Sequence, residues 1–240
     1  MSARPSVVID CFPDSVRRYR EGYAIVAVDV IRATTTAVTA VALGRRCFPV
    51  ASIEHALPIA ARLDQPLLVG ELGGNMPYGF DLTNSPAELA TRRDVSRPMI
   101  LLSSSGTQMI HNAAECDASY IACLRNLTAV VEHLLDRHRR VAVVGAGTRG
   151  EFREEDQYCC ARVAAALEDA GFVPEDQRTR DVVDRWRGQP VDCWTGSKSV
   201  DYLRKSGQVR DLDFILEHVD DVPAAFMLKH GEVVLMPVSE

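Results

Sequence analysis

Short apolar runs alternate with longer segments of helical periodicity along most of this 240-residue chain. Each apolar run has the length of a buried strand, and the segments between the runs place apolar residues three or four positions apart, which is typical of amphipathic helices. Strands that alternate with helices build βαβ units and a parallel sheet. We therefore expect an α/β fold of the three-layer α/β/α type, with a largely parallel, mixed sheet. The predicted strands cover residues 6–9, 24–28, 47–50, 67–69, 99–102, 119–122 and 141–144, and the predicted helices cover residues 33–43, 53–63, 107–114, 128–136 and 154–170.

The pattern changes after residue 171. Residues 172–197 mix charged residues with several Pro and Gly, so we expect an irregular connection or a loosely packed lid there. Helical periodicity returns at residues 199–205 and 212–219, and two short apolar runs then flank His230-Gly231, which predicts a C-terminal hairpin at an edge of the sheet. The length favours a single domain over residues 1–240, and a C-terminal subdomain from about residue 172 is the alternative.

Composition and charge narrow the class of protein. Apolar residues make up 47% of the chain and charged residues 25%, as in soluble globular proteins. The net charge of -6 argues against nucleic acid as a partner, because that would require a basic surface. No apolar stretch is long enough to cross a membrane and no signal segment is recognisable, so we expect a cytoplasmic protein, with a homo-oligomer left open. The seven cysteines form no C-x-x-C pair, which favours reduced thiols.

Four of the apolar runs lead directly into acidic, glycine or hydroxyl residues. In an open α/β sheet, ligands bind beyond the carboxyl ends of parallel strands. Four such endings therefore predict one shared pocket. The polar clusters cover residues 29–36, 70–71, 103–107 and 145–150.

Two of these endings carry a carboxylate, Asp29 and Glu71. One carboxylate after a strand usually caps a turn, but two from separate strand ends favour a shared hard cation such as Mg²⁺, which binds few carboxylates together with water and substrate oxygens. Arg32 could bind an oxyanion beside them through a bidentate contact, or form a salt bridge. Residues 103–107 end a strand and open a helix, so their free N–H groups suit either an anion or an ordinary helix cap.

Two familiar motifs fit poorly. Gly145-x-Gly147-x-x-Gly150 matches a dinucleotide fingerprint, but acidic residues follow it where a pyrophosphate would lie, so a tight turn is the favoured interpretation. Cys11-x5-Arg17 has the spacing of a cysteine-dependent phosphatase loop, yet Pro13 removes an N–H group and no glycine lets the backbone enclose a phosphate. The glycine-rich stretch over residues 73–86 is expected to cover the pocket.

Taken together, five segments resemble the 2-phosphosulfolactate phosphatase family in order and spacing. The family implies an α/β/α fold and Mg²⁺-dependent hydrolysis of a small phosphate ester, 2-phosphosulfolactate. The chain departs from the family pattern at Leu72, where members usually carry arginine, and at Ser104 or Ser105, where they carry asparagine. The segments are D-V-I-R-A-T-T-T at residues 29–36, G-E-L-G-G at 70–74, G-F-D-L-T-N-S-P at 79–86, S-S-G-T at 104–107 and A-G-T-R-G at 146–150, followed by Glu155-Asp156.

These observations lead to one functional hypothesis with two alternatives. The hypothesis is an Mg²⁺-dependent phosphoric monoester hydrolase, with either water or Asp29 as the nucleophile. The alternatives are a non-catalytic binder of an anionic metabolite and a nicotinamide-dependent oxidoreductase. The candidate catalytic residues are Asp29, Arg32 and Glu71; the candidate metal ligands are Asp29, Glu71, Asp81 and Asp156; and the candidate substrate-binding residues are Arg32, Thr34, Thr35, Ser105, Gly106, Thr107, Gly147 and Thr148.

Overall fold

All seven predicted strands form, and they belong to one mixed sheet. The structure is a computed structural model that describes residues 4–236. Within that range the sheet has ten strands in the order β4-β5-β3-β10-β9-β6-β2-β7-β1-β8. The strands are β1 (Ser6–Cys11), β2 (Ala24–Val28), β3 (Cys47–Val50), β4 (Leu67–Gly70), β5 (Met99–Leu102), β6 (Ala118–Ala122), β7 (Arg140–Gly145), β8 (Val173–Pro174), β9 (Phe226–Lys229) and β10 (Glu232–Leu235).

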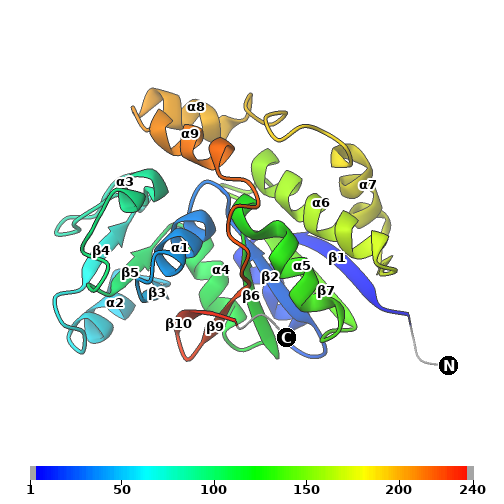
Figure 1. The fold of residues 1–240 in the computed structure, drawn as a ribbon, viewed down its shortest axis with the longest axis horizontal. Helices are drawn as coiled ribbons and strands as arrows, with labels where there is room; N and C mark the ends of the chain where they lie inside the picture. The colour runs from blue at the N-terminus through cyan, green and yellow to red at the C-terminus, as the bar shows by residue number, and fades with distance from the viewer. Residues whose placement is uncertain (1–3, 237–240) are drawn as a thin grey trace.

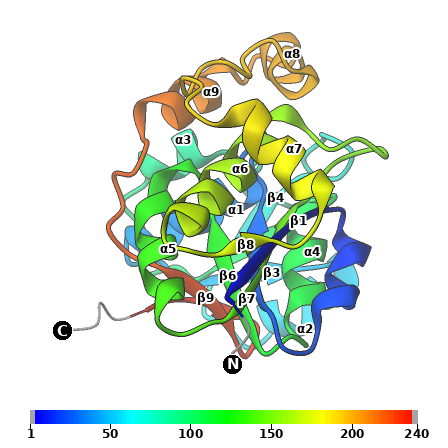
Figure 2. The same ribbon diagram turned by 90° about the vertical axis from the view of Figure 1, so that its right-hand side faces the viewer.

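Helices cover both faces of the sheet, which confirms the three-layer α/β/α architecture. Figure 2 shows α4 on the opposite side of the sheet from α5 and α6. No helix within residues 4–236 is long and apolar enough to span a membrane. The helices are α1 (Ala33–Ala42), α2 (Ile53–Ala60), α3 (Pro86–Ala90), α4 (Gly106–Ala113), α5 (Leu127–Leu135), α6 (Glu154–Asp169), α7 (Gln177–Trp186), α8 (Lys198–Lys205) and α9 (Val209–Glu217), with 3-10 helices at η1 (Pro13–Tyr19) and η2 (Leu124–Asn126).

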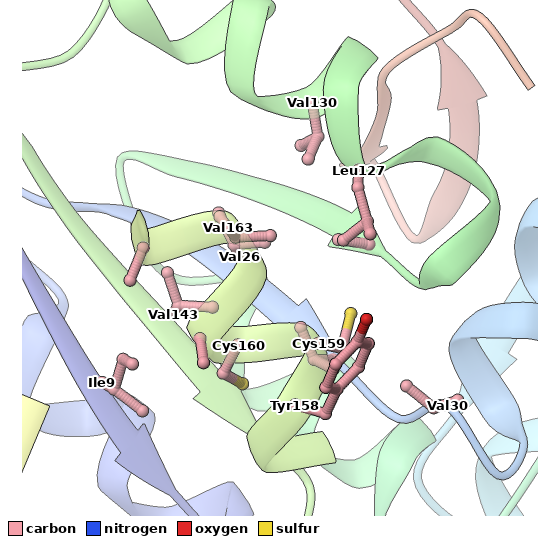
Figure 3. Close-up of a cluster of buried hydrophobic side chains, with 14 of the residues drawn as sticks. Ile9, Val26, Val30, Leu127, Val130, Val143, Tyr158, Cys159, Cys160 and Val163 are labelled. Carbon is pink, nitrogen blue, oxygen red and sulfur yellow. The ribbon is translucent and has the colours of Figure 1, made fainter. Parts of the chain in front are cut away.

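Strand β2 shows why both faces need a cover. Its side chains alternate between two buried clusters: Val26 packs with α5 and α6, whereas Ile25 packs with α1 and α4. Burial on both faces explains why this strand reads as a continuous apolar run. Figure 3 shows Cys160 and Val163 of α6 beside the strands, so the thiol of Cys160 is part of the core packing. Burial raises the pKa of that thiol well above its ordinary value.

The C-terminal hairpin lies in the middle of the sheet. Its strands β9 and β10 pair with each other, as predicted, but the prediction of an edge position is wrong. Strand β10 pairs with β3 through Val233 and Cys47, and β9 pairs with β6 through Met227 and Tyr120. The hairpin thereby joins two groups of parallel strands, β4-β5-β3 and β6-β2-β7-β1-β8. The turn sequence specified the hairpin but contained no information about which strands would flank it.

The expectation of an irregular connection over residues 172–197 is wrong for its first half. Strand β8 pairs with β1, and α7 begins at the N-cap Asp176, whose side chain accepts a bond from Thr179 N at 2.7 Å. Val183 and Trp186 bury one face of α7 among otherwise charged residues. Pro174 is the last residue of β8 and Gly188 follows the end of α7, whereas Pro190 and Gly196 lie in the segment after the helix. Only residues 187–197 consist of turns.

Candidate active site

The structure brings strand ends from both parallel groups into contact. A Cβ atom at Gly106, the first residue of α4, would lie 2.0 Å from Asp29 Oδ2 and 2.6 Å from the Cβ of Ala33. No other residue type fits at Gly106, because real side chains do not approach so closely. The end of β5 therefore meets the end of β2, although the hairpin separates these strands within the sheet.

Asp29 lies directly after β2, and its side chain is buried. Removal from water is the main cause that raises its pKa from 3.8 to about 7, and the negative charges of Glu71 and Glu155 add to the effect. The backbone N–H of Ala33 and the cation of Arg32 act in the opposite direction. Asp29 is therefore the centre of a group of carboxylates that lack enough positive charge.

Glu71 follows β4 and is held by three donors. Its carboxylate accepts bonds from Gly74 N at 2.7 Å, Ser104 N at 2.7 Å and Ser104 Oγ at 3.0 Å. Residues 72–75 form a tight turn, closed by reciprocal bonds between Leu72 and Asn75, with positive φ at both central glycines. Glu71 thus caps this turn and the loop over residues 103–107, while its negative charge acts on Asp29. Capping of a turn and a place in the carboxylate group are therefore compatible for this residue.

The first turn of α6 contributes two further buried carboxylates. Asp156 accepts a bond from Val30 N at 2.8 Å and another from the backbone of Gly147, so it ties the loop after β2 to the loop after β7. Glu155 is 1% exposed, and its Oε2 has no hydrogen-bond partner within residues 4–236. Burial raises the pKa of both carboxyl groups. The sequence analysis selected Asp156 from this turn as a candidate metal ligand but missed Glu155 beside it.

This set of donors fits a hard cation. Hard oxygen donors from Asp29 and Glu71 with the unpartnered oxygen of Glu155 nearby are suited to Mg²⁺, which takes one or two carboxylates and completes its shell with water and substrate. Within residues 4–236, no group of three or more His, Cys, Asp or Glu side chains is arranged to enclose a metal.

Asp81, a predicted metal ligand, is held at a different place. Its carboxylate accepts a bond from Leu68 N at 2.8 Å and pairs with Arg97 at 3.4 Å. Leu68 lies inside β4, before the strand end that carries Glu71. The structure does not bring Asp81 into the carboxylate group.

Arg32 is 4% exposed and its guanidinium pairs with Asp211 of α9. The same nitrogen, Nη1, donates to Gln208 Oε1 at 2.5 Å. The salt bridge that the sequence left open is thus observed, but in a buried place and with a partner 179 residues away. No local pattern around residue 211 could have identified this contact.

Three of the predicted substrate-binding hydroxyls are engaged within their own loops. Thr34 Oγ1 donates to Asp29 O at 2.8 Å, and Thr35 Oγ1 donates to Val30 O at 2.8 Å. Thr107 Oγ1 accepts from Ser103 N at 2.8 Å. These threonines shape the loops, which is the ordinary capping interpretation.

Ser105 and Gly106 differ from the threonines. Ser105 is the N-cap residue of α4, but its side chain makes no capping bond. It is only half-buried, and the adjacent Gly106 abuts Asp29. This pair keeps its polar groups available at the start of a helix, where backbone N–H groups favour an anion.

The glycine-rich segment after β7 is a tight turn. Thr148 and Glu151 exchange backbone bonds at 2.9 and 3.0 Å, and the central residues Arg149 and Gly150 have φ of 53° and 76°. A dinucleotide fingerprint requires a helix that starts at the third glycine, whereas α6 starts four residues later at Glu154. The helix start that a dinucleotide site requires is therefore absent from this turn. Gly147 lies near the carboxylates through its backbone contact with Asp156.

Cys11 does not head a phosphate-binding loop. Its side chain is 1% exposed, and burial raises the pKa of its thiol to about 12, so it is not a thiolate near neutral pH. Residues 13–19 form the 3-10 helix η1. Arg17 points to solvent and pairs with Asp14.

Helices α8 and α9 lie across this end of the molecule (Figure 1). Tyr202 of α8 donates to the carbonyl of Gly74, and Lys198 pairs with Glu151 at 2.5 Å. These contacts reach the turn after β4 and the turn after β7. The segment over residues 73–86, which was predicted to cover the pocket, is therefore bonded to α8 through Gly74 and to α9 through Ser85.

A groove of about 490 Å³ lies elsewhere on the molecule. It is lined in part by Thr39 and contains none of the carboxylates described above.

Comparison with known proteins identifies close relatives of the chain. The model of the 2-phosphosulpholactate phosphatase family matches residues 11–225. A probable 2-phosphosulfolactate phosphatase of Carboxydothermus hydrogenoformans is 35% identical over 93% of this chain and 94% of its own length. The 2-phosphosulfolactate phosphatase of Methanothermobacter thermautotrophicus is 31% identical over 88% and 89% of the two chains. A probable 2-phosphosulfolactate phosphatase of Pseudothermotoga lettingae is 40% identical over a shorter match, 61% of this chain and 63% of its own length.

Proposed function

The chain belongs to the 2-phosphosulfolactate phosphatase family, and we propose that it is an Mg²⁺-dependent phosphatase of small anionic phospho-acids. The substrate would be 2-phosphosulfolactate or a close analogue. Water would cleave the phosphate ester to give the 2-hydroxy acid and inorganic phosphate. A cytoplasmic location, expected from the sequence, belongs to the same proposal.

The observation that carries this proposal is the environment of Asp29. Its carboxylate is buried against Gly106 and is surrounded by further carboxylates, which leaves the group short of positive charge. A divalent cation would relieve that shortage, and Asp29 and Glu71 are the residues that would hold it, with Glu155 close by. When bound, Mg²⁺ neutralises phosphoryl oxygens and lowers the pKa of a coordinated water.

The residues of the chain then have distinct tasks. Arg32 would bind one anionic group of the substrate, because its positive charge acts on Asp29 and lowers the pKa of that carboxyl group. Ser105 and Gly106 would receive phosphoryl oxygens at the start of α4. Asp156 would keep the loops after β2 and β7 in register, since it binds the backbone of both. Helices α8 and α9, which lie across this end of the molecule, would exclude bulk water from the reacting group.

The test is release of inorganic phosphate from 2-phosphosulfolactate by the purified protein, with Mg²⁺ and after treatment with EDTA. We expect turnover with Mg²⁺ and its loss with EDTA. Full turnover in excess EDTA would exclude the metal requirement. Binding of the substrate without phosphate release, under both conditions, would favour the non-catalytic binder instead.

A further inference from the structure

The hydrogen bonds of Arg32 leave one edge of its guanidinium without a protein acceptor. Both Asp211 and Gln208 bind Nη1. Within residues 4–236 neither Nε nor Nη2 has an acceptor, and neither is among the fully enclosed unpaired atoms, in contrast to Nε of Arg45. The Nε–Nη2 edge is the pair of parallel donors that fits a phosphate, sulfonate or carboxylate group in a bidentate contact.

The other side of the guanidinium is anchored firmly. Asp211 is 2% exposed and uses its two oxygens for different partners. Oδ2 receives Arg32, while Oδ1 accepts from Ser85 Oγ at 2.5 Å and from Ala87 N at 3.2 Å. Asp211 therefore links α9, the start of α3 and the loop after β2. A carboxylate held from two sides fixes the rotation of the guanidinium it binds.

Arg32 also lies close enough to Asp29 for its charge to act on that carboxylate. Its charge lowers the pKa of Asp29, whereas Glu71 and Glu155 raise it, so the guanidinium lies within electrostatic range of the central carboxylate. An anion gripped by the free edge would be held beside Asp29. Without Asp211 and Gln208, the guanidinium could rotate or turn toward the carboxylates, and the free edge would be lost.

We infer that Asp211 and Gln208 are positioning residues that present the Nε–Nη2 edge of Arg32 to an anionic group of the substrate. This inference rests on the proposed function for the identity of the substrate but not for the anion site itself. It makes α9, which lies far from the family-like strand-end segments in the sequence, part of substrate recognition. The group bound is a tetrahedral or planar oxyanion.

The test measures binding and turnover separately. Inorganic phosphate is titrated by calorimetry, and phosphate release from 2-phosphosulfolactate gives KM and kcat, for the wild type, Asp211→Asn, Gln208→Ala and Asp213→Asn. Asp213 is the matched control, because it is an exposed aspartate on the same helix with no contact to Arg32. We expect Asp211→Asn to weaken phosphate binding and raise KM about tenfold or more, with a smaller change in kcat. Gln208→Ala should have an effect of about threefold, and Asp213→Asn none.

Each result decides the inference. A folded Asp211→Asn variant with wild-type phosphate affinity overturns it, as does an equal effect of Asp213→Asn. If Asp211→Asn does not fold, Gln208→Ala decides, since it leaves no buried charge unpaired, and unchanged affinity there overturns the inference. A wild-type protein that binds no phosphate also overturns it. Phosphate binding that depends on Asp211, without any turnover, would support the anion site and refute the phosphatase.

Discussion

The two groups of parallel strands contribute different kinds of residues to the candidate site. From β2 and β7 come Asp29 and, at the start of α6, Glu155 and Asp156, all of them at most 7% exposed. From β4 and β5 come Glu71 and Ser105, which are half-buried. The first side is crowded with carboxylates whose pKa values are raised, whereas on the second side the Glu71 carboxylate is held by backbone N–H groups. The buried side, from β2 and β7, therefore carries most of the negative charge. The open side, from β4 and β5, carries partly exposed residues that a substrate could reach.

The strongest test of this difference is Asp29→Asn. We expect kcat to fall about 10²- to 10³-fold, because the variant removes the central charge of the buried side. Phosphate release from 2-phosphosulfolactate measures the effect, and a folded far-UV spectrum checks integrity. Asp14→Asn is the control, since Asp14 is an exposed aspartate on η1. Retention of most activity in Asp29→Asn would remove the distinction between the two sides.

The buried side should also give stability a pH dependence. The pKa of Asp29 in the folded protein is raised to about 7, above its unfolded value, so the folded state binds this proton more tightly. Its contribution to stability is complete below about pH 4 and is lost as the pH rises through about 7. In metal-free protein, we expect this contribution to change by roughly 1 to 4 kcal/mol over that range. Urea unfolding of the wild type and of Asp29→Asn at several pH values measures this contribution. If the free energy of unfolding has the same pH dependence in both proteins, the prediction is wrong.

On the open side, Glu71→Gln should have a smaller effect than Asp29→Asn. We expect kcat to fall about 10- to 10²-fold, because the amide removes the charge and replaces one of the two oxygens that accept N–H bonds from Gly74 and Ser104. Ser104→Ala is the matched variant, since it keeps the charge of Glu71 and removes only the Ser104 hydroxyl, which donates to Glu71 and accepts from Gly73 N. Wild-type kinetics in Glu71→Gln would restrict that residue to capping.

Leu72 tests whether the substrate reaches the open side of the site. It is 41% exposed and follows Glu71 directly. Leu72→Arg should lower KM for 2-phosphosulfolactate about tenfold, because it adds a charge-assisted contact for the second anion. The comparison substrate is a phosphomonoester without a second anionic group. An equal change for both substrates would mean that residue 72 points away from the bound acid.

The smallest effect is expected at Cys11. Its thiol is buried beside the loop after β7, and its raised pKa keeps it protonated. Cys11→Ser should retain near wild-type kcat and KM in the phosphate-release assay. A phosphocysteine trapped by mass spectrometry would contradict this and add a nucleophile to the buried side.

Local sequence patterns predicted the parts of the structure that depend on local chemistry. Apolar runs gave the seven strands because burial on both faces demands uninterrupted apolar residues. Asp29 and Glu71 were predicted to lie together because the carboxyl ends of parallel strands face one region, and in the structure the charge of Glu71 acts on Asp29. Thr34 and Thr35 were predicted to bind substrate; their hydroxyls instead donate to the backbone of their own loop, as threonine hydroxyls readily do.

The features that were missed depend on contacts between distant segments. Nothing near residue 211 in the sequence shows that its carboxylate will meet Arg32, and the acidic run that contains Glu155 reads as a solvated helix start. Helix α7 was hidden because only three of its residues are buried. Asp211 and α7 are both held by segments far away in the sequence: Asp211 by Arg32, and α7 by β1 through the bond from Ile9 N to Thr179 Oγ1.

The central hairpin also bears on the order in which the protein is made. Strands β9 and β10 leave the ribosome after every strand they join, because β3 and β6 come much earlier in the chain. Until the hairpin is synthesised, β3 and β6 each have an edge without its final partner, and such edges invite pairing with other chains. The ten-stranded sheet can therefore be completed only after β10 has been synthesised.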